Sequence, residues 1–210
     1  MEEKTTILYF YDALCGLCYG FSPVIQKIYQ ENQEQFDFHI ISGGLKLGEA
    51  VGPIGVVAPY IKAGAYKTVE EKCGVKFGEA FVNGPMEKGD MIFNSEPPAI
   101  ALAIVKEKMP EQAFAFGSIL HQAIYVDGMH PEDLPAYVPY AAKIGLDGEA
   151  FIAEMAQPHY LEAAKKDFAM ARHFGINGFP AMVGIKGDSA FLISHGYMAY
   201  EALTARLNTL

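Results

Sequence analysis

Two cysteines, Cys15 and Cys18, follow directly on an apolar run near the N-terminus, and this arrangement most constrains the fold. The run Thr5–Tyr11 is rich in β-branched and aromatic residues, which predicts a short buried strand. After Cys18, apolar residues recur at the three- and four-residue spacing of an amphipathic helix, and 36–42 reads as a second strand. A strand, a helix and a strand within about 45 residues predict a βαβ unit with parallel strands.

The sequence pattern changes twice further along the chain. From residue 52 to residue 158 helix signals dominate, and several of the predicted helices open on proline. The pattern after residue 158 predicts a helix, then a hairpin of two strands, and then a final helix. We therefore predict an α/β domain built from 1–51 and 159–210, with an all-helical insertion domain at 52–158.

Composition limits the classes of partner. The net charge of −9 argues against binding a nucleic-acid backbone or an anionic membrane surface, since both need a basic patch. Three cysteines in 210 residues are too few for a disulfide scaffold. The N-terminus "MEEKTT" is acidic, unlike a secretory signal, and no long apolar run suits a membrane span. We expect a soluble, cytoplasmic protein.

The position of the cysteine pair assigns a role to each thiol. A cysteine reacts as its thiolate, and Cys15 at a helix N-terminus lies near unpaired N–H groups and the positive end of the helix dipole. Cys18 lies one turn further into the helix, within reach of Cys15. Cys15 is thus the attacking thiol, and Cys18 resolves the mixed disulfide. Pro23 lies inside the same predicted helix, where we expect a kink.

Three other interpretations of the pair are weaker. A zinc site needs more ligands, and Cys73 stands alone with no histidine near it in the chain, so we predict no metal site. Inert core thiols rarely bracket a strand-to-helix junction. A structural disulfide closing so small a ring removes little chain entropy. Cys73 itself fits a half-buried thiol at a helix end.

The segment "FYDALCGLCYG" resembles the active-site segment of the DsbA-like thiol–disulfide oxidoreductases, in particular their FrnE-type branch. The likeness rests on the aromatic strand end, Asp12, the CxxC pair and the aromatic Tyr19. Pro23 matches the helix-kink proline of thioredoxin-like proteins. Later blocks resemble the same branch, namely 94–104, 121–147 and 171–184, the last of which contains "NGFPAMV". The resemblance covers nearly the whole chain.

This resemblance implies a thioredoxin-like fold with a large helical insertion. It also implies that Pro180 is cis and lies against the CxxC pair, whereas the residues alone favour an ordinary trans proline at a strand start. Under the resemblance, the backbone of Phe179 is exposed beside Cys15 and available to an extended substrate strand. Met182, just after Pro180, is then placed near the substrate. Asp12 either caps the loop before the helix, which we favour, or relays protons to Cys18.

The residues between the cysteines depart from the family. Gly16 and Leu17 stand where the branch has proline followed by an aromatic residue. No Lys, Arg or His occurs between Lys4 and Lys27, and Asp12 disfavours a nearby thiolate. A weakly stabilised thiolate favours a reductase or isomerase over a dedicated oxidase.

The sequence therefore predicts an enzyme that exchanges disulfides with protein or small-thiol substrates, with glutathione as one candidate. It needs no bound cofactor beyond the redox-active Cys15–Cys18 disulfide, which an external thiol reductant or oxidant recycles. Two alternatives stay open: a kappa-type glutathione transferase or isomerase on the same fold, and a non-catalytic binding module. The sequence leaves the oligomeric state open.

Overall fold

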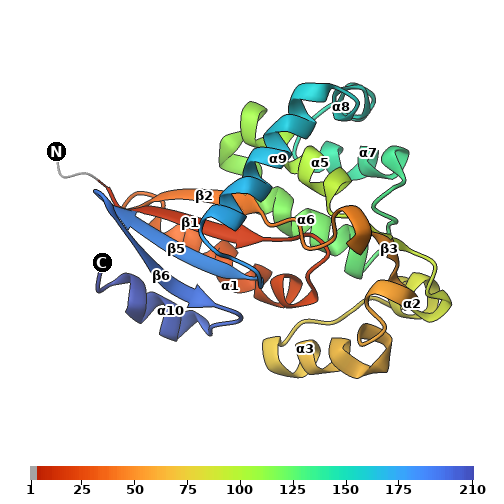
Figure 1. Ribbon diagram of the computed structural model, residues 1–210, viewed down its shortest axis with the longest axis horizontal. Coiled ribbons are helices and arrows are strands. Elements are labelled where there is room, and N and C mark those ends of the chain that lie inside the picture. The colour runs from red at the N-terminus through yellow and green to blue at the C-terminus, as the bar shows by residue number, and fades with distance from the viewer. Residues whose placement is uncertain (1–3) are drawn as a thin grey trace.

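The computed structural model describes residues 4–210, and its centre is a four-stranded mixed sheet in the order β2-β1-β5-β6 (Figure 1). Its strands are β1 (Thr6–Tyr11), β2 (Asp37–Ser42), β5 (Ala181–Lys186) and β6 (Ser189–His195). β1 pairs parallel with β2 and antiparallel with β5, and β5 pairs antiparallel with β6. Helix α1 (Gly16–Asn32) connects the two parallel strands, which confirms the predicted βαβ unit.

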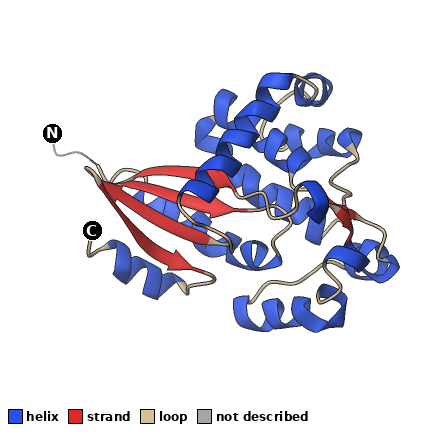
Figure 2. Cartoon of the chain, viewed as in Figure 1, coloured by secondary structure: helices blue, strands red, loops and turns tan. Residues whose placement is uncertain are grey.

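The chain between β2 and β5 is mostly helical (Figure 2). Its helices are α2 (Ile54–Val57), α3 (Tyr66–Cys73), α4 (Glu79–Phe81), α5 (Glu96–Lys108), α6 (Ala113–Tyr125), α7 (Val138–Ala142), α8 (Gly148–Met155) and α9 (Pro158–His173), and α10 (Tyr200–Leu207) follows β6. Single 3-10 turns cover Gly48–Ala50, Pro110–Gln112 and Leu134–Tyr137, and π turns cover Ile61–Ala65 and Val82–Met86. Two very short strands, β3 (Gly52–Pro53) and β4 (Ile92–Phe93), pair within this region.

Strand β1 is buried on both of its faces. Ile7, Tyr9 and Tyr11 belong to the large core cluster that contains α1 and α6, while Leu8 and Phe10 pack in a second cluster with residues of α9 and β5. Figure 1 shows α9 on one side of the sheet and α1 and α10 on the other. A central strand that is covered on both faces reads as a continuous apolar run, which is the pattern found in the sequence.

Helix α6 joins the helical segment to the sheet. The ring of Phe114 stacks on Tyr29 of α1 with centroids 4.4 Å apart, and on Tyr9 of β1 at 6.0 Å. Gly117 allows close approach, because a Cβ there would lie 2.9 Å from Cδ1 of Ile40 in β2. The sheet and α6 therefore share one continuous core. The division into 1–51 with 159–210 and 52–158 stays a prediction.

A partly buried ion pair ties α9 to the rest of the fold. Asp167 of α9 accepts hydrogen bonds from Lys106 of α5 at 2.8 Å and from the backbone N–H of Ser42, at the end of β2, at 2.9 Å. Asp147 caps α8 by accepting a hydrogen bond from the N–H of Ala150. Helix α1 continues through Pro23. Within residues 4–210, no helix has the length and apolar character needed to cross a membrane.

We predict that Phe114→Ala lowers the free energy of unfolding by about 3–5 kcal/mol, because it removes a buried ring that joins α6, α1 and β1. Urea denaturation measures the change. Val56→Ala serves as the control, since Val56 is 74% exposed, and its effect stays within about 0.5 kcal/mol. Equal effects from the two substitutions would contradict the shared core.

Candidate active site

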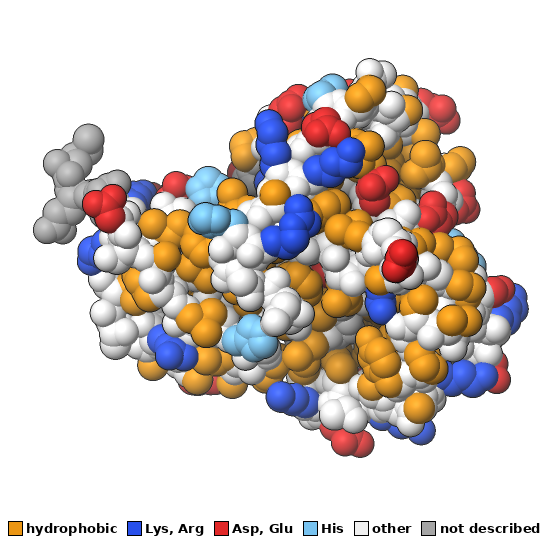
Figure 3. Space-filling model, in the orientation of Figure 1, with side chains coloured by type: hydrophobic (Ala, Val, Ile, Leu, Met, Phe, Trp, Pro, Cys, Tyr) orange, Lys and Arg blue, Asp and Glu red, His pale blue; other side chains and the backbone are white. Residues whose placement is uncertain are grey.

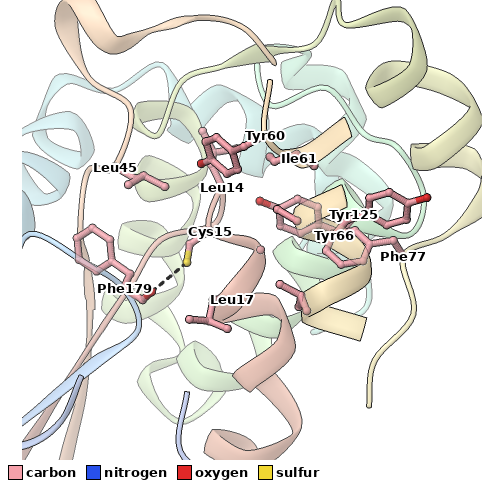
Figure 4. Close-up of a pocket in the computed structure, with 13 residues that line it drawn as sticks. Leu14, Cys15, Leu17, Leu45, Tyr60, Ile61, Tyr66, Phe77, Tyr125 and Phe179 are labelled. Atoms are coloured by element: carbon pink, nitrogen blue, oxygen red, sulfur yellow. Dashed lines mark hydrogen bonds between the residues drawn. The ribbon is translucent and has the colours of Figure 1, made fainter. Parts of the chain in front are cut away.

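Cys15 is the N-cap residue of α1, and its sulfur lies between two backbone groups (Figure 4). The N–H of Cys18 donates to Sγ of Cys15 at 3.2 Å, and the Cys15 thiol donates to the carbonyl oxygen of Phe179 at 3.4 Å. The turn before the helix closes with a bond from the N–H of Cys15 to the carbonyl oxygen of Asp12. An N–H group and the helix N-terminus both favour the anionic sulfur.

The two thiols differ in access. Cys15 is 8% exposed and Cys18 is 0% exposed, so a reagent from solvent reaches Cys15 first. Burial, followed by the contact with Cys15, raises the pKa of Cys18 well above its ordinary value. Cys18 therefore stays protonated until Cys15 has reacted, which agrees with its expected role as the resolving thiol.

Phe179 and Pro180 lie beside Cys15, and the peptide bond between them is cis. The ring of Phe179 rests on the backbone of Gly43, where an added Cβ would lie 2.1 Å from ring atom Cζ. Pro180 is buried, while Phe179 is partly exposed. Glycine at position 43 thus leaves the space that holds Phe179 against the thiol.

Asp12 is a buried carboxylate that connects three segments. It is 2% exposed, and its oxygens accept from the N–H of Leu14 at 2.9 Å, the N–H of Leu45 at 2.8 Å and Oγ of Ser95 at 3.0 Å. The Leu14 bond is the loop-capping contact that the sequence favoured. Burial raises the pKa of Asp12, and hydrogen bonds, led by that from Leu45, offset part of the rise. The carboxylate holds the loop before α1, the loop after β2 and the start of α5 together.

His121 of α6 lies beneath the same loop. Its Nε2 is 3.1 Å from the carbonyl oxygen of Asp12, and its Nδ1 is 2.9 Å from Oγ of Ser22. A carbonyl only accepts, so Nε2 carries the proton and Nδ1 accepts from the Ser22 hydroxyl. Burial lowers the pKa of His121 to about 4, so the imidazole is neutral at pH 7 and adds no positive charge near the thiols.

A cavity of about 270 Å³ opens beside Cys15. Gly16 and Leu17 form part of its wall together with Leu14 and Cys15 (Figure 4). The rest comes from the loop after β2, the α2–α3 segment, Phe77, the end of α6 and Phe179. Among the described residues that line it, none has a charged side chain. In the view of Figure 3, hydrophobic side chains gather on the surface between the sheet and the α2–α3 segment.

The structure brings together most of the residues singled out from sequence. Cys15, Gly16, Leu17 and Phe179 border one cavity, and Asp12, Cys18 and Pro180 lie buried directly behind them. Pro23, expected to support the helix, lies further along α1 than both cysteines and outside the cavity wall. The prediction that Met182 lies near the substrate is wrong. Its side chain is 0% exposed and packs in the core from β5, opposite Tyr9 of β1, so the structure does not support a substrate contact there.

Several site residues gave no local signal in the sequence. Tyr60, Tyr125, Ser95 and His121 reach the site from distant parts of the chain. Cys73 lies at the end of α3 and is partly buried, as expected. Its Sγ would lie 2.7 Å from a Cβ placed on Gly20, so α3 is seated on α1 at that glycine.

Comparisons with known proteins agree on the fold. The family model described as a DSBA-like thioredoxin domain matches residues 6–208. A search of curated proteins gave no match. Among solved structures, a protein from Nitrosomonas europaea, provisionally named a protein disulfide isomerase, is 28% identical with a TM-score of 0.86 and covers 99% of this chain and 97% of its own. The predicted fold class, thioredoxin-like with a large helical insertion, is confirmed.

Two more distant structures share this fold. The cytosolic disulfide reductase DsbM from Pseudomonas aeruginosa, solved with GSH, is 24% identical with a TM-score of 0.75, over 97% of this chain and 98% of its own. A 2-hydroxychromene-2-carboxylate isomerase is 17% identical with a TM-score of 0.63, over 97% and 93%. At these identities the likeness concerns the fold alone.

We expect iodoacetamide to modify Cys15 well before Cys18, because only Cys15 borders the cavity and the pKa of Cys18 is raised. Mass spectrometry of quenched, digested samples of the reduced protein gives the order of labelling. Faster labelling of Cys18 would overturn the assignment of attacking and resolving thiols.

We predict that His121 makes stability fall as the pH falls. Its pKa of about 4 in the folded chain lies below the roughly 6.5 of an unfolded histidine, so acid protonates the unfolded state first. The loss is about 2 kcal/mol between pH 7 and pH 4.5. Urea denaturation at both pH values should show a smaller loss in His121→Gln. The same substitution at His173, which is exposed, should leave the loss as in the natural chain.

Proposed function

Because the chain belongs to the family of DSBA-like thioredoxin domains, we propose that it exchanges disulfides through Cys15 and Cys18, acting as a reductase or isomerase. One observation carries the proposal. Sγ of Cys15 sits at the start of α1, 3.2 Å from the N–H of Cys18 and 3.4 Å from the carbonyl oxygen of Phe179, at the edge of an open cavity. An accessible thiol beside a buried thiol is the arrangement that two-step exchange requires.

The reaction proceeds in two displacements. The Cys15 thiolate attacks one sulfur of a substrate disulfide, a Cys15–substrate bond forms, and the other substrate sulfur leaves as a thiolate that takes up a proton. Cys18 then attacks Sγ of Cys15 and gives up its proton, and the second substrate thiol leaves. The substrate gains two electrons, and the Cys15–Cys18 disulfide forms. An external thiol or dithiol reduces it again.

The direction of electron flow follows from the electrostatics around Cys15. A strongly oxidising enzyme needs a thiolate stabilised by nearby positive charge, since that energy favours its reduced form. Here none of the wall residues within 4–210 is a cation, and His121, the buried imidazole beneath the loop, is neutral at pH 7. The proposal therefore favours reduction or isomerisation of substrate disulfides.

Phe179 supplies the second half of the substrate site in this proposal. Its carbonyl oxygen lies beside the Cys15 thiol, and its N–H has no hydrogen-bond acceptor among the described residues. An extended substrate strand recognised through its backbone would pair with such groups. Gly16 and Leu17 complete the surface around the thiol without adding charge.

The relatives suggest where such an enzyme works. The DsbM structure was solved with GSH and is described as cytosolic, so we propose glutathione or another small thiol as the source of electrons, in a reducing compartment. Membership of the FrnE-type branch forms part of the proposal, and so does the cytoplasmic location.

The first test is reduction of insulin with dithiothreitol as the electron source, followed by turbidity. We expect activity in the natural chain, near-complete loss in Cys15→Ser, and a trapped mixed disulfide in Cys18→Ser that mass spectrometry detects. A transferase would instead conjugate glutathione and keep that activity in Cys18→Ser. A binding module would keep full function in the Cys15→Ser/Cys18→Ser double variant.

The second test is the reduction potential of the couple, measured against glutathione buffers. We expect about −180 to −270 mV, the range of isomerases and reductases, because none of the described residues in the cavity wall brings a positive charge to Cys15. A potential near −120 mV, that of a strong oxidant, would refute the proposed direction.

A further inference from the structure

The second displacement requires a thiolate at a position that water does not reach. Cys18 must lose its proton before it attacks the Cys15–substrate disulfide, yet it is 0% exposed, and burial raises its pKa well above the ordinary value. When an external thiol reduces the Cys15–Cys18 disulfide, the same buried sulfur leaves as a thiolate. Such a thiolate needs hydrogen-bond donors from the protein. The backbone N–H of Asp12 is one donor, and it lowers the pKa of Cys18.

The hydroxyl of Tyr9 is a second polar group beneath α1. Tyr9 lies on β1 and is 2% exposed, and its hydroxyl has no oxygen or nitrogen partner among the described residues. Its ring lies against that of Phe21, with centroids 5.9 Å apart. Phe21 follows Cys18 by three residues on α1, and both are 0% exposed in the same core cluster as Tyr9. Residues three apart share one helix face, so the face of α1 that meets Tyr9 also carries Cys18.

The Tyr9 hydroxyl and the Cys18 thiol influence each other. Burial first, and then the negative charge of an ionised Cys18, raise the pKa of Tyr9, and a side-chain hydrogen bond with Cys18 adds to the rise. Tyr9 therefore stays protonated at neutral pH, and its O–H is available as a donor. A donor bonds more strongly to a charged acceptor than to a neutral one, so this contact matters most when Cys18 is ionised.

Tyr11, two residues further along β1, provides a matched comparison. It is 1% exposed, belongs to the same core cluster, and its hydroxyl also lacks a partner among the described residues. Its ring lies against α6, with the centroid 5.4 Å from that of His121 and with Cζ 3.7 Å from a Cβ placed on Gly117. The Tyr9 ring instead contacts the face of α1 that carries Cys18.

We propose that Tyr9 is a catalytic residue of disulfide exchange, whose hydroxyl donates a hydrogen bond to the thiolate form of Cys18. In the second displacement Cys18 loses its proton, attacks Sγ of Cys15, and the substrate sulfur leaves with the electron pair of the broken bond. In re-reduction an external thiolate attacks Sγ of Cys15, and the electron pair of the broken Cys15–Cys18 bond stays on Cys18 until a proton arrives. Tyr9 stabilises Cys18 in both directions and keeps its own proton. The inference rests on the proposed function and adds a residue that speeds its second step.

Both displacements can be followed in one reaction. Reduced protein attacks 4,4′-dithiodipyridine, which releases one pyridinethione when Cys15 attacks and a second when Cys18 closes the disulfide, and absorbance records both. Cys73→Ser is present in every sample, so that only the two active-site thiols report. We expect Tyr9→Phe to slow the second release about 5-fold and to change the first by less than about 2-fold. Loss of the bond makes the thiolate about 10-fold scarcer, and the greater nucleophilicity of a more basic thiolate offsets part of this.

The control is Tyr11→Phe, which removes an equally buried hydroxyl from the same strand and should leave both releases unchanged. Urea denaturation should show no loss of stability in either variant, because neither hydroxyl has an oxygen or nitrogen partner. Reduction of the oxidised protein by glutathione, followed by acid quenching and alkylation, should also be about 5-fold slower in Tyr9→Phe, since Cys18 is then the leaving thiolate. The reduction potential at pH 7 should stay unchanged, because Cys18 is protonated in the reduced protein with or without Tyr9.

The outcomes separate this inference from the function it rests on. An unchanged second release in Tyr9→Phe would overturn the role of Tyr9 while exchange through Cys15 and Cys18 still stands. Slowing of both releases, equal slowing in Tyr11→Phe, or a shifted reduction potential would show a structural effect and overturn it as well. If the chain with natural Tyr9 gives no second release, the proposed function itself fails.

Discussion

The buried carboxylate of Asp12 is the interaction on which the arrangement of the site depends. An ionised carboxyl taken out of water must have its oxygens occupied, and here the donors are Leu14, Leu45 and Ser95. Each donor belongs to a different segment: the loop that carries Cys15, the loop after β2, and the start of α5. The hydrogen bonds to this one carboxylate therefore hold the strand-to-helix turn against the helical insertion. The backbone carbonyl oxygen of Asp12 also accepts a hydrogen bond from His121, which connects α6 to the same loop.

The same network decides the electrostatics around the thiols. The groups that the fold adds near Cys15 are a carboxylate, a neutral imidazole and tyrosine hydroxyls, and the described cavity wall contributes no cation. The N–H of Cys18 and the start of α1 are thus the main groups that stabilise a thiolate at Cys15. This is the physical basis for the proposed direction of electron flow, in which the protein acts as a reductase or isomerase.

Local features of the site were predictable from sequence because short-range forces set them. The strand before Cys15, the helix after it and the capping contact of Asp12 to Leu14 involve residues only a few positions apart. Long-range placement was not predictable from periodicity or spacing. Tyr125 and Phe77 both line the cavity, and Gly78, just before α4, donates its N–H to the carbonyl oxygen of Tyr125 at the end of α6. No pattern in either segment predicts this contact. Met182 was misplaced for a similar reason: alternation along β5 turns its side chain into the core.

The sequence by itself determined the fold class and the cysteine pair at the start of a helix, because both depend on local spacing and on motifs that span the whole chain. Only the tertiary structure decided what surrounds Cys15. Whether charges from distant segments reach a thiol, and whether a hydroxyl such as that of Tyr125 is left without a partner, depends on how the helical insertion packs on α1. That packing arises from contacts such as that of Cys73 in α3 on Gly20 in α1, which exist only once the chain has folded.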